Sequence, residues 1–243
     1  MSPSASERPI VPLAPHQFWQ TVFPAGTFDA APAGGFSDLY PASLADGRQI
    51  ALPIRVLPGD GSRAVASMIV NQASFAVEDA LSDAMASYAR AYDPEVVIGV
   101  PTLGLPLANG VARRLGHDRM VALGTSRKFW YSEELSEPMS SITSPEHAKR
   151  LYLDPRMLPL LEGRRVLVVD DVISSGTSML AVLKLLAKAG IRPVASIFAM
   201  LQGDVWRQAI GEHDASLVER IHGAVASPRL IRTDAGGWVP VRS

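Results

Sequence analysis

Short apolar runs alternate with segments of helical periodicity through the middle of the chain. Apolar positions that recur every three or four residues predict helices at 74–92, 101–116 and 178–190. Continuous apolar runs predict four strands, at 96–100, 119–125, 164–171 and 193–200. Strands that are apolar throughout are typical of a parallel sheet covered on both faces. The pattern therefore predicts an α/β fold, with a mostly parallel sheet and helices on both faces.

The flanking segments lack this alternation. Residues 1–35 are rich in Pro, Ala, Ser and Gly and predict a loosely ordered N-terminal arm, which leaves 36–243 as one domain with a core at about 74–200. Residues 48–58 have strand character but are broken by prolines. Residues 127–150 are polar and without a sustained period, and so long a loop inside a compact domain is usually functional or disordered.

Composition narrows the class of partner. Apolar residues make up 47% of the chain, enough for a sizeable core, and the net charge of −1 points neither to nucleic acid nor to a membrane surface. The absence of cysteine excludes disulfides and thiolate metal sites, and the five histidines show no metal-binding spacing. No signal peptide is recognisable, and the most apolar helical run, 179–191, is short and contains lysines. We therefore expect a cytoplasmic protein.

One stretch, VLVVDDVISSGTSM at 166–179, carries most of the candidate chemistry. Asp170 and Asp171 stand where a buried strand emerges. Since two dry carboxylates repel each other, at least one should face solvent, a metal or ligand hydroxyls. The small residues 174–178 then open a helix, whose free amides and dipole favour a phosphate. The stretch predicts a phosphate-binding loop beside two acceptors for ribose hydroxyls.

A plainer interpretation is a strand followed by a helix that Ser174 or Ser175 caps. It explains the serines, but not the two acids or the clustering of small residues. The stretch lacks the lysine of a P-loop, which argues against a nucleoside triphosphatase. The chain also lacks the G-x-G-x-x-G and G-x-S-x-G motifs.

The stretch resembles the signature for 5-phosphoribosyl-1-diphosphate (PRPP) in the type I phosphoribosyltransferases: an apolar strand, two acids, and a small-residue loop with Gly and Thr. The resemblance covers about residues 90–200 and implies that family's fold, with a hood from parts of 36–70 and 201–243. It implies that Asp170 and Asp171 hold the ribose hydroxyls. It also implies that the 5′-phosphate is bound by Ser174, Ser175, Gly176, Thr177 and Ser178.

Residues 99–108 resemble the diphosphate loop of this family, which follows the first core strand. The resemblance implies that Thr102, Leu103 and Gly104 line the PRPP site. Many members carry Lys or Arg where this chain has Leu103, and leucine cannot neutralise diphosphate. Backbone amides, Mg²⁺ and other cations would then have to do more.

Residues 125–131 open the region where the family carries its mobile catalytic loop, so we expect 128–148 to order over bound substrates. Arg127 and Lys128 resemble a basic pair that meets the diphosphate in adenine- and orotate-type members. Without the resemblance, a solvated pair at a strand end would be the better explanation of these two residues. Ser174 stands where hypoxanthine- and guanine-type members carry an aspartate as general base, which argues against that subgroup.

The expected catalytic set is Lys128, Arg127, Asp171 and Glu134. Adenine-type enzymes use a glutamate on this loop near the base, although a solvated acidic face is the plainer interpretation of Glu134. The side chains expected near the base are Val172, Trp130 and Trp238. Trp130 belongs to an aromatic triple that packs in the core, closes over a base or holds the loop shut. Trp238 either stacks on the base or packs at a C-terminal turn.

The resemblance implies transfer of the phosphoribosyl group from PRPP to a nitrogen of a nucleobase-like acceptor, purine- or pyrimidine-type, with release of diphosphate. Mg²⁺ would be carried by PRPP rather than by a protein cage, and a homodimer is expected by resemblance. Two alternatives stay open: a non-catalytic PRPP-sensing module, which Leu103 favours, and a PRPP-using enzyme whose acceptor is not a base. The intact Ser-Arg-Lys opening at 126–128 favours an enzyme.

Overall fold

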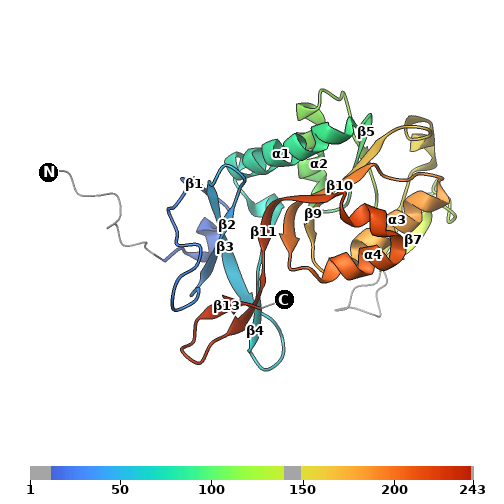
Figure 1. Cartoon of the computed structure of the whole chain (residues 1–243). Coiled ribbons are helices and arrows are strands. Elements are labelled where there is room, and N and C mark those ends of the chain that lie inside the picture. The colour runs from blue at the N-terminus through green and yellow to red at the C-terminus, as the bar shows by residue number, and fades with distance from the viewer. Residues whose placement is uncertain (1–11, 140–148, 242–243) are drawn as a thin grey trace.

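The computed structural model describes residues 12–139 and 149–241. Its centre is a five-stranded parallel sheet in the order β11-β10-β9-β5-β6 (Figure 1). The strands are β5 (Val96–Gly99), β6 (Val121–Ala122), β9 (Val166–Ile173), β10 (Ala195–Gln202) and β11 (Ile221–Ser227). Because neighbouring strands run parallel, their carboxyl ends and the loops that follow them meet at one edge of the sheet.

Helices cover both faces of this sheet, which confirms the predicted fold class. One face carries α1 (Phe75–Ala89) and α2 (Gly104–Arg114), and the other carries α3 (Thr177–Lys188) and α4 (Val205–Val218), which is interrupted at Asp214. In β9, Leu167 and Val169 pack toward the first pair of helices, whereas Val166 and Val168 pack toward the second. Burial on both faces explains why this strand is apolar throughout.

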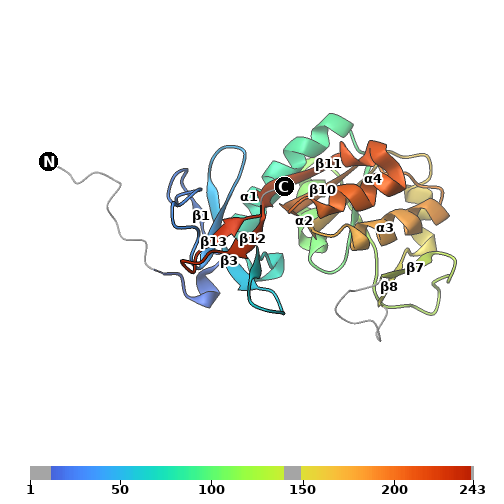
Figure 2. The same cartoon turned by 60° about the horizontal axis from the view of Figure 1, so that its bottom comes forward.

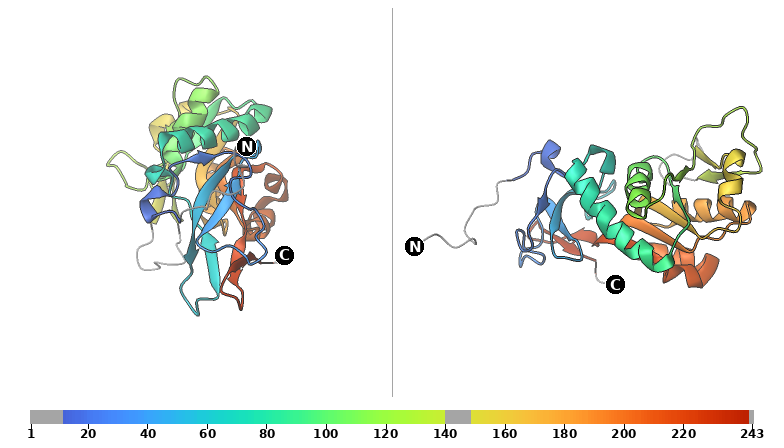
Figure 3. Two further views of the ribbon diagram at one scale, coloured as in Figure 1. Left: turned by 90° about the vertical axis from the view of Figure 1, so that its left-hand side faces the viewer. Right: turned by 90° about the horizontal axis from the view of Figure 1, so that it is seen from above.

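A second, antiparallel sheet stands beside the first, and α1 runs from one to the other (Figure 3). Its strands are β1 (Val22–Phe23), β2 (Leu39–Ser43), β3 (Gln49–Val56), β4 (Arg63–Ala66), β12 (Arg229–Arg232) and β13 (Trp238–Pro240). The order is β1-β3-β4-β12-β13, and β2 also pairs with β3. Because β12 pairs with β4, the sheet joins segments from both ends of the described chain. Except for β1, these strands lie within 36–70 and 201–243, the segments predicted to form the hood.

The expectation of a loosely ordered arm is wrong for residues 12–35. Phe18, Trp19 and Phe28 are buried in the same core as α1 and α2, and β1 pairs with β3. These isolated aromatic residues supply burial that the surrounding Pro, Ala and Gly residues do not suggest. Residues 1–11 lie outside the described part of the chain.

Other boundaries also differ from the prediction. The parallel core extends past residue 200, because α4 and β11 continue it. The polar region at 127–150 contains an antiparallel hairpin, on the side of the parallel sheet away from the second sheet (Figure 2). Its strands are β7 (Ser136–Met139) and β8 (Lys149–Tyr152). Within β3, Pro53 does not interrupt the pairing with β2.

Four short 3-10 turns complete the elements: η1 (Pro15–Gln17), η2 (Val70–Gln72), η3 (Arg90–Tyr92) and η4 (Pro155–Leu160). Among the described residues, no helix combines the length and the apolar character that a membrane crossing requires.

Candidate active site

The two acids lie inside β9, next to its carboxyl end. Asp170 stands opposite Phe198 of β10 in the register, and its Oδ1 accepts a hydrogen bond of 2.8 Å from the backbone N–H of Asp171. Burial raises the pKa of Asp170 well above its ordinary value, and the charge of Asp171 raises it further. Burial also raises the pKa of Asp171. The paired carboxylates are therefore costly when the site is empty, and ligand hydroxyls or a cation would relieve that cost.

The loop Ser174–Ser178 follows directly and turns the chain from β9 into α3. Gly176 is the N-cap residue of α3 and has a φ of +83°. A residue with a side chain would be strained in this conformation, which explains why glycine occupies the position. The hydroxyls of Ser175 and Thr177 lie 3.0 Å apart. The first amides of a helix lack partners within it, so the start of α3 suits an anion.

A small cavity of about 110 Å³ opens at this loop. We call the two the phosphate cavity and the phosphate loop, after the group predicted to bind there. It is lined by Asp170, Val172, Ile173, Ser174, Ser175, Gly176, Ser178, Met179 and Phe198. The acid Asp170 and the hydroxyl-bearing loop thus share one cavity, which has the size of a small group such as a phosphate. Of the side chains expected near the base, Val172 is the one that lies here.

The loop after β5 lies against Asp170. A Cβ on Gly104 would lie 2.7 Å from Oδ1 and 2.8 Å from Cα of Asp170, and 3.0 Å from the carbonyl oxygen of Val169. Only glycine allows this approach, which brings the segment Thr102–Gly104 against the acids. Leu103 is half-buried immediately before α2 and Thr102 is exposed.

The loop that follows β6 carries the two predicted cations, Arg127 and Lys128, and it lies on the surface. Arg127 pairs with Glu133 at 2.8 Å, and both side chains are about half exposed. Lys128 and Glu134 are exposed as well. The loop follows a strand of the same sheet as the acids, but no hydrogen bond or ion pair among the described residues joins it to Asp170 or Asp171. The predicted ordering of 128–148 stays a prediction, and residues 140–148 lie outside the described part.

Trp130 packs away from the paired acids. Its Nε1–H donates to Asp154 at 3.3 Å, and the guanidinium of Arg156 lies 4.5 Å from its ring. Arg156 also holds Asp154, whose pKa is lowered to about 2 by that hydrogen bond. The structure thus assigns Trp130 to a contact with the segment after β8, not to a cavity near Val172.

Trp238 is also placed differently from the prediction. Only 7% of it is exposed, and it packs with Phe36, Ala64 and Leu230 in the small core of the second sheet. Backbone hydrogen bonds of 2.8 Å in both directions tie it to Phe36. The ring of Trp238 is covered by this core, which favours packing over stacking on a base, although the residue lies in β13 and not at a surface turn.

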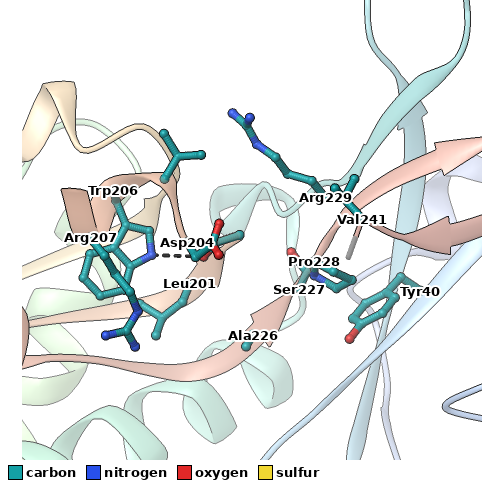
Figure 4. Close-up of a pocket in the computed structure, with 12 residues that line it drawn as sticks. Tyr40, Leu201, Asp204, Trp206, Arg207, Ala226, Ser227, Pro228, Arg229 and Val241 are labelled. Atoms are coloured by element: carbon teal, nitrogen blue, oxygen red, sulfur yellow. Dashed lines mark hydrogen bonds between the residues drawn. The ribbon is translucent and has the colours of Figure 1, made fainter. Parts of the chain in front are cut away.

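Sequence reasoning missed a larger cavity, of about 510 Å³, where the second sheet meets the carboxyl ends of β10 and β11 (Figure 4). We call it the inter-sheet cavity. It is lined by Tyr40, Leu201, Gly203, Asp204, Val205, Trp206, Arg207, Ala226, Ser227, Pro228, Arg229 and Val241. These residues come from segments far apart in the sequence, so no local motif could have indicated them.

Trp206 connects the inter-sheet cavity with the phosphate loop. It is 1% exposed, and its Nε1–H donates to the carbonyl of Gly203 at 3.0 Å. A Cβ on Gly176 would lie 3.4 Å from Cα and 3.5 Å from Cβ of Trp206. Trp206 thus lines the inter-sheet cavity and packs against Gly176, which lines the smaller cavity, so the two cavities lie on neighbouring elements.

Comparison with known proteins agrees with this geometry. The phosphoribosyl transferase domain family matches residues 67–220, which contain both loops and the paired acids. The chain belongs to this family. The chain has the fold of solved type I phosphoribosyltransferases. The sequence identities to these structures are low, and the likeness shows the fold alone. The APRTase of Giardia lamblia, complexed with 9-deazaadenine, has a TM-score of 0.55 at 20% identity, over 71% of this chain and 93% of that one.

A second structure, adenine phosphoribosyltransferase of Thermoanaerobacter pseudethanolicus, gives a TM-score of 0.54 at 17% identity, over 72% of this chain and 95% of that one. Curated relatives differ in role. The transcriptional regulator GfcR of Halobacterium salinarum is 29% identical over 60% of this chain and 59% of its own length. A hypoxanthine/guanine phosphoribosyltransferase of Methanosalsum zhilinae is 30% identical over 50% of this chain and 58% of its own.

The matches thus span about three-fifths of the length of these two relatives. Amidophosphoribosyltransferase 3 of Arabidopsis thaliana is 35% identical over 42% of this chain, and the match covers 18% of its own length. The relatives include both an enzyme of oxopurines and a regulator. The distinction drawn from Ser174, against the 6-oxopurine subgroup, therefore stays a prediction.

Proposed function

We propose that this phosphoribosyltransferase-family chain transfers the 5-phosphoribosyl group from PRPP to a nitrogen of a nucleobase-like acceptor and releases diphosphate. The observation that carries the proposal is the meeting of three elements at one sheet edge: the paired acids Asp170 and Asp171, the hydroxyl-rich loop at the start of α3, and the close approach of Gly104. Together these provide acceptors for ribose hydroxyls beside a phosphate cavity and a backbone loop.

In the proposed reaction, the acceptor nitrogen forms a bond to C1 of the ribose while the bond from C1 to the diphosphate oxygen breaks. The electron pair leaves with the diphosphate, and the nitrogen loses its proton. Asp170 and Asp171 position the ribose, and the segment Ser174–Ser178 holds the 5′-phosphate. Arg127 and Lys128 neutralise the leaving group, and Glu134 accepts the proton. Placing the reactants in line and stabilising developing charge supply most of the acceleration that such sites give.

Mg²⁺ is part of the proposal because the donor set fits it. Mg²⁺ favours phosphate oxygens, water and one or two carboxylates, and Asp170 and Asp171 offer carboxylate oxygens whose burial makes a nearby cation favourable. When bound with PRPP, it would neutralise part of the diphosphate charge. A cytoplasmic location and a homodimer belong to the same proposal, and they rest on composition and on the family resemblance.

The test is release of diphosphate from PRPP and Mg²⁺ in the presence of single acceptors, with adenine, hypoxanthine and orotate among them. The double variant Asp170→Asn with Asp171→Asn is the matched control, because it keeps the shape of both side chains. We expect the wild type to turn over with at least one acceptor and to bind PRPP. In the double variant, PRPP affinity should fall by at least ~2 kcal/mol, because two charged hydrogen-bond acceptors are lost. Unchanged affinity in that variant would contradict the proposal.

A non-catalytic PRPP sensor is the second candidate. Leu103, in place of a cation in the diphosphate loop, and the similarity to a transcriptional regulator favour it. A sensor would bind PRPP with the same dependence on Asp170 and Asp171, yet release no diphosphate with any acceptor. Measuring affinity and turnover on one preparation therefore separates the two.

A further inference from the structure

The inter-sheet cavity is used by none of the groups assigned to PRPP. We propose that it takes the acceptor, and that this acceptor carries an acidic group, such as a carboxylate, which Arg229 binds. The inference rests on the proposed function, because it names the acceptor class for the same reaction. Its position supports it: Trp206, which lines the cavity, also packs against Gly176, so the cavity adjoins the loop assigned to the 5′-phosphate.

Charge around the cavity favours an anion. Its lining carries two cations, Arg207 and Arg229, and one acid, Asp204. Among the ion pairs of the described residues, none involves these three. Arg207 lies with its guanidinium 4.7 Å from the ring of Trp206, whereas Arg229 reaches from β12 toward the start of α4 (Figure 4). Arg229 is thus the cation free to meet a ligand, and a guanidinium pairs best with a planar carboxylate.

Gly203 makes room for this arginine. A Cβ on Gly203 would lie 3.2 Å from Cγ and 3.6 Å from Cδ of Arg229, so a larger residue would displace the side chain from the cavity. Gly203 also has a φ of +63° and donates its N–H to the carbonyl of Ser227 at 2.8 Å. The turn after β10 and the strand β12 therefore fix where Arg229 runs.

A second, independent observation indicates a ligand. Ser227 lines the cavity and is 3% exposed, and its Oγ has no hydrogen-bond partner among residues 12–139 and 149–241. A buried hydroxyl without a partner is destabilising, so such groups are usually satisfied by a ligand or an ordered water. The oxygen is covered in this conformation, so a rotation of the Ser227 side chain would present it to a carboxylate or ring oxygen bound by Arg229.

The experiment compares acids with their decarboxylated counterparts. Binding is measured by calorimetry with ribose 5-phosphate and Mg²⁺ present, so that no transfer takes place. The probes are orotate with uracil, nicotinate with pyridine, and imidazole-4-carboxylate with imidazole. We expect one of the acids to bind at least ~10-fold more tightly than its counterpart, because a charge-assisted hydrogen bond is added. Arg229→Met should abolish this preference.

Arg232→Met is the matched control, because Arg232 lies in the same strand but stacks near Trp238, outside the cavity. It should keep the preference, while Ser227→Ala should weaken binding of the acid less than Arg229→Met. The inference is overturned if no acid binds with a Kd below about 1 mM. It is also overturned if acid and counterpart bind equally in the wild type, or if the preference survives Arg229→Met. A preference for neutral ligands that Asp204→Asn removes would overturn it as well.

Failure of the proposed function would look different. PRPP affinity that does not depend on Asp170 and Asp171 would contradict phosphoribosyl binding at β9, whatever the ligands of the inter-sheet cavity. Conversely, normal PRPP binding with no preference for acids would remove the acidic acceptor alone.

Discussion

The phosphate cavity and the inter-sheet cavity lie side by side but are built in opposite ways. The first is made almost entirely by one stretch, 170–179, with Phe198 as its only contribution from elsewhere. The second is assembled from Tyr40, the turn after β10, the end of β11 and its continuation, and Val241. The difference teaches that the proposed donor site can be recognised in a sequence because it is contiguous, whereas the proposed acceptor site is formed only after the chain has folded.

The two cavities also differ in charge. The phosphate cavity contains Asp170, whose pKa is raised, and gains its affinity for anions from the loop and the helix start. The inter-sheet cavity has two arginines, one aspartate and a buried hydroxyl. Such a division suits a donor recognised by its hydroxyls and phosphate, and an acceptor recognised by its own substituents. The variants below test how independent the two sites are.

The largest effect is expected from Trp206→Ala, which changes a residue that lines the inter-sheet cavity and packs against Gly176. Trp206 is 1% exposed, and replacing a buried tryptophan by alanine typically costs 3–5 kcal/mol. We expect the free energy of unfolding to fall by about that amount and PRPP affinity to fall in the protein that stays folded. Trp238→Ala is the control: it should also destabilise, because Trp238 is buried in the second sheet, but leave PRPP affinity unchanged. Equal PRPP affinities in both variants would show that the cavities are independent.

Lys128→Ala should come next, with kcat lower by roughly 10²-fold and PRPP affinity much less affected. The charge of the diphosphate grows as it leaves, so a cation aimed at it acts mainly in the transition state. Steady-state kinetics and calorimetry with the acceptor found by screening provide the measurement. Lys184→Ala, at an exposed position of α3, serves as the control. Equal losses in binding and turnover would mean that Lys128 only holds PRPP.

Gly104→Ala should weaken the donor site and spare the inter-sheet cavity. The added Cβ would lie 2.7 Å from Oδ1 of Asp170, so the loop or the acid must shift, at a cost of about 1–3 kcal/mol in stability. PRPP affinity should fall with it. In Gly211→Ala the new Cβ meets Val218 at 3.6 Å, an ordinary contact, and we expect neither loss. Denaturation and PRPP titration of the two variants decide the point.

The smallest effect concerns pH. Because the pKa values of Asp170 and Asp171 are raised, the folded chain holds a proton more tightly than the unfolded chain. The free energy of unfolding should therefore fall as pH rises from about 4, the ordinary carboxyl pKa, through the raised values. Asp170→Asn should flatten this fall and raise the Tm of the ligand-free protein at pH 7 by about 2–4 °C.

Asp60→Asn is the matched control for the pH experiment, since hydrogen bonds from Ser62 lower the pKa of this exposed carboxyl. Its Tm at pH 7 should not rise. A wild-type Tm that increases steadily from pH 4 to pH 8, with no difference in Asp170→Asn, would contradict the assignment of a strained acid pair.

The contrast also explains what could be predicted from the sequence. The strand, acids and loop at 166–178 are contiguous, so the chemistry of the donor site follows from one stretch. The ordered segment 12–35 was missed because Phe18, Trp19 and Phe28 are spaced without a period among turn-forming residues. Trp130 and Trp238 were assigned to the base from their positions in the sequence, but the partners that hold them, Asp154 and Phe36, come from other segments.

The pairing of β12 with β4 has a consequence for synthesis. Ribosomes add residues from the N-terminus, so β4, α1, the paired acids and α3 are all made before Arg229. The parallel strands around Asp170 can assemble while the rest of the chain is still in the exit tunnel. The inter-sheet cavity cannot close until β12 arrives and returns to a strand made more than 160 residues earlier. A nascent chain therefore acquires the elements of the phosphate cavity first and completes the inter-sheet cavity last.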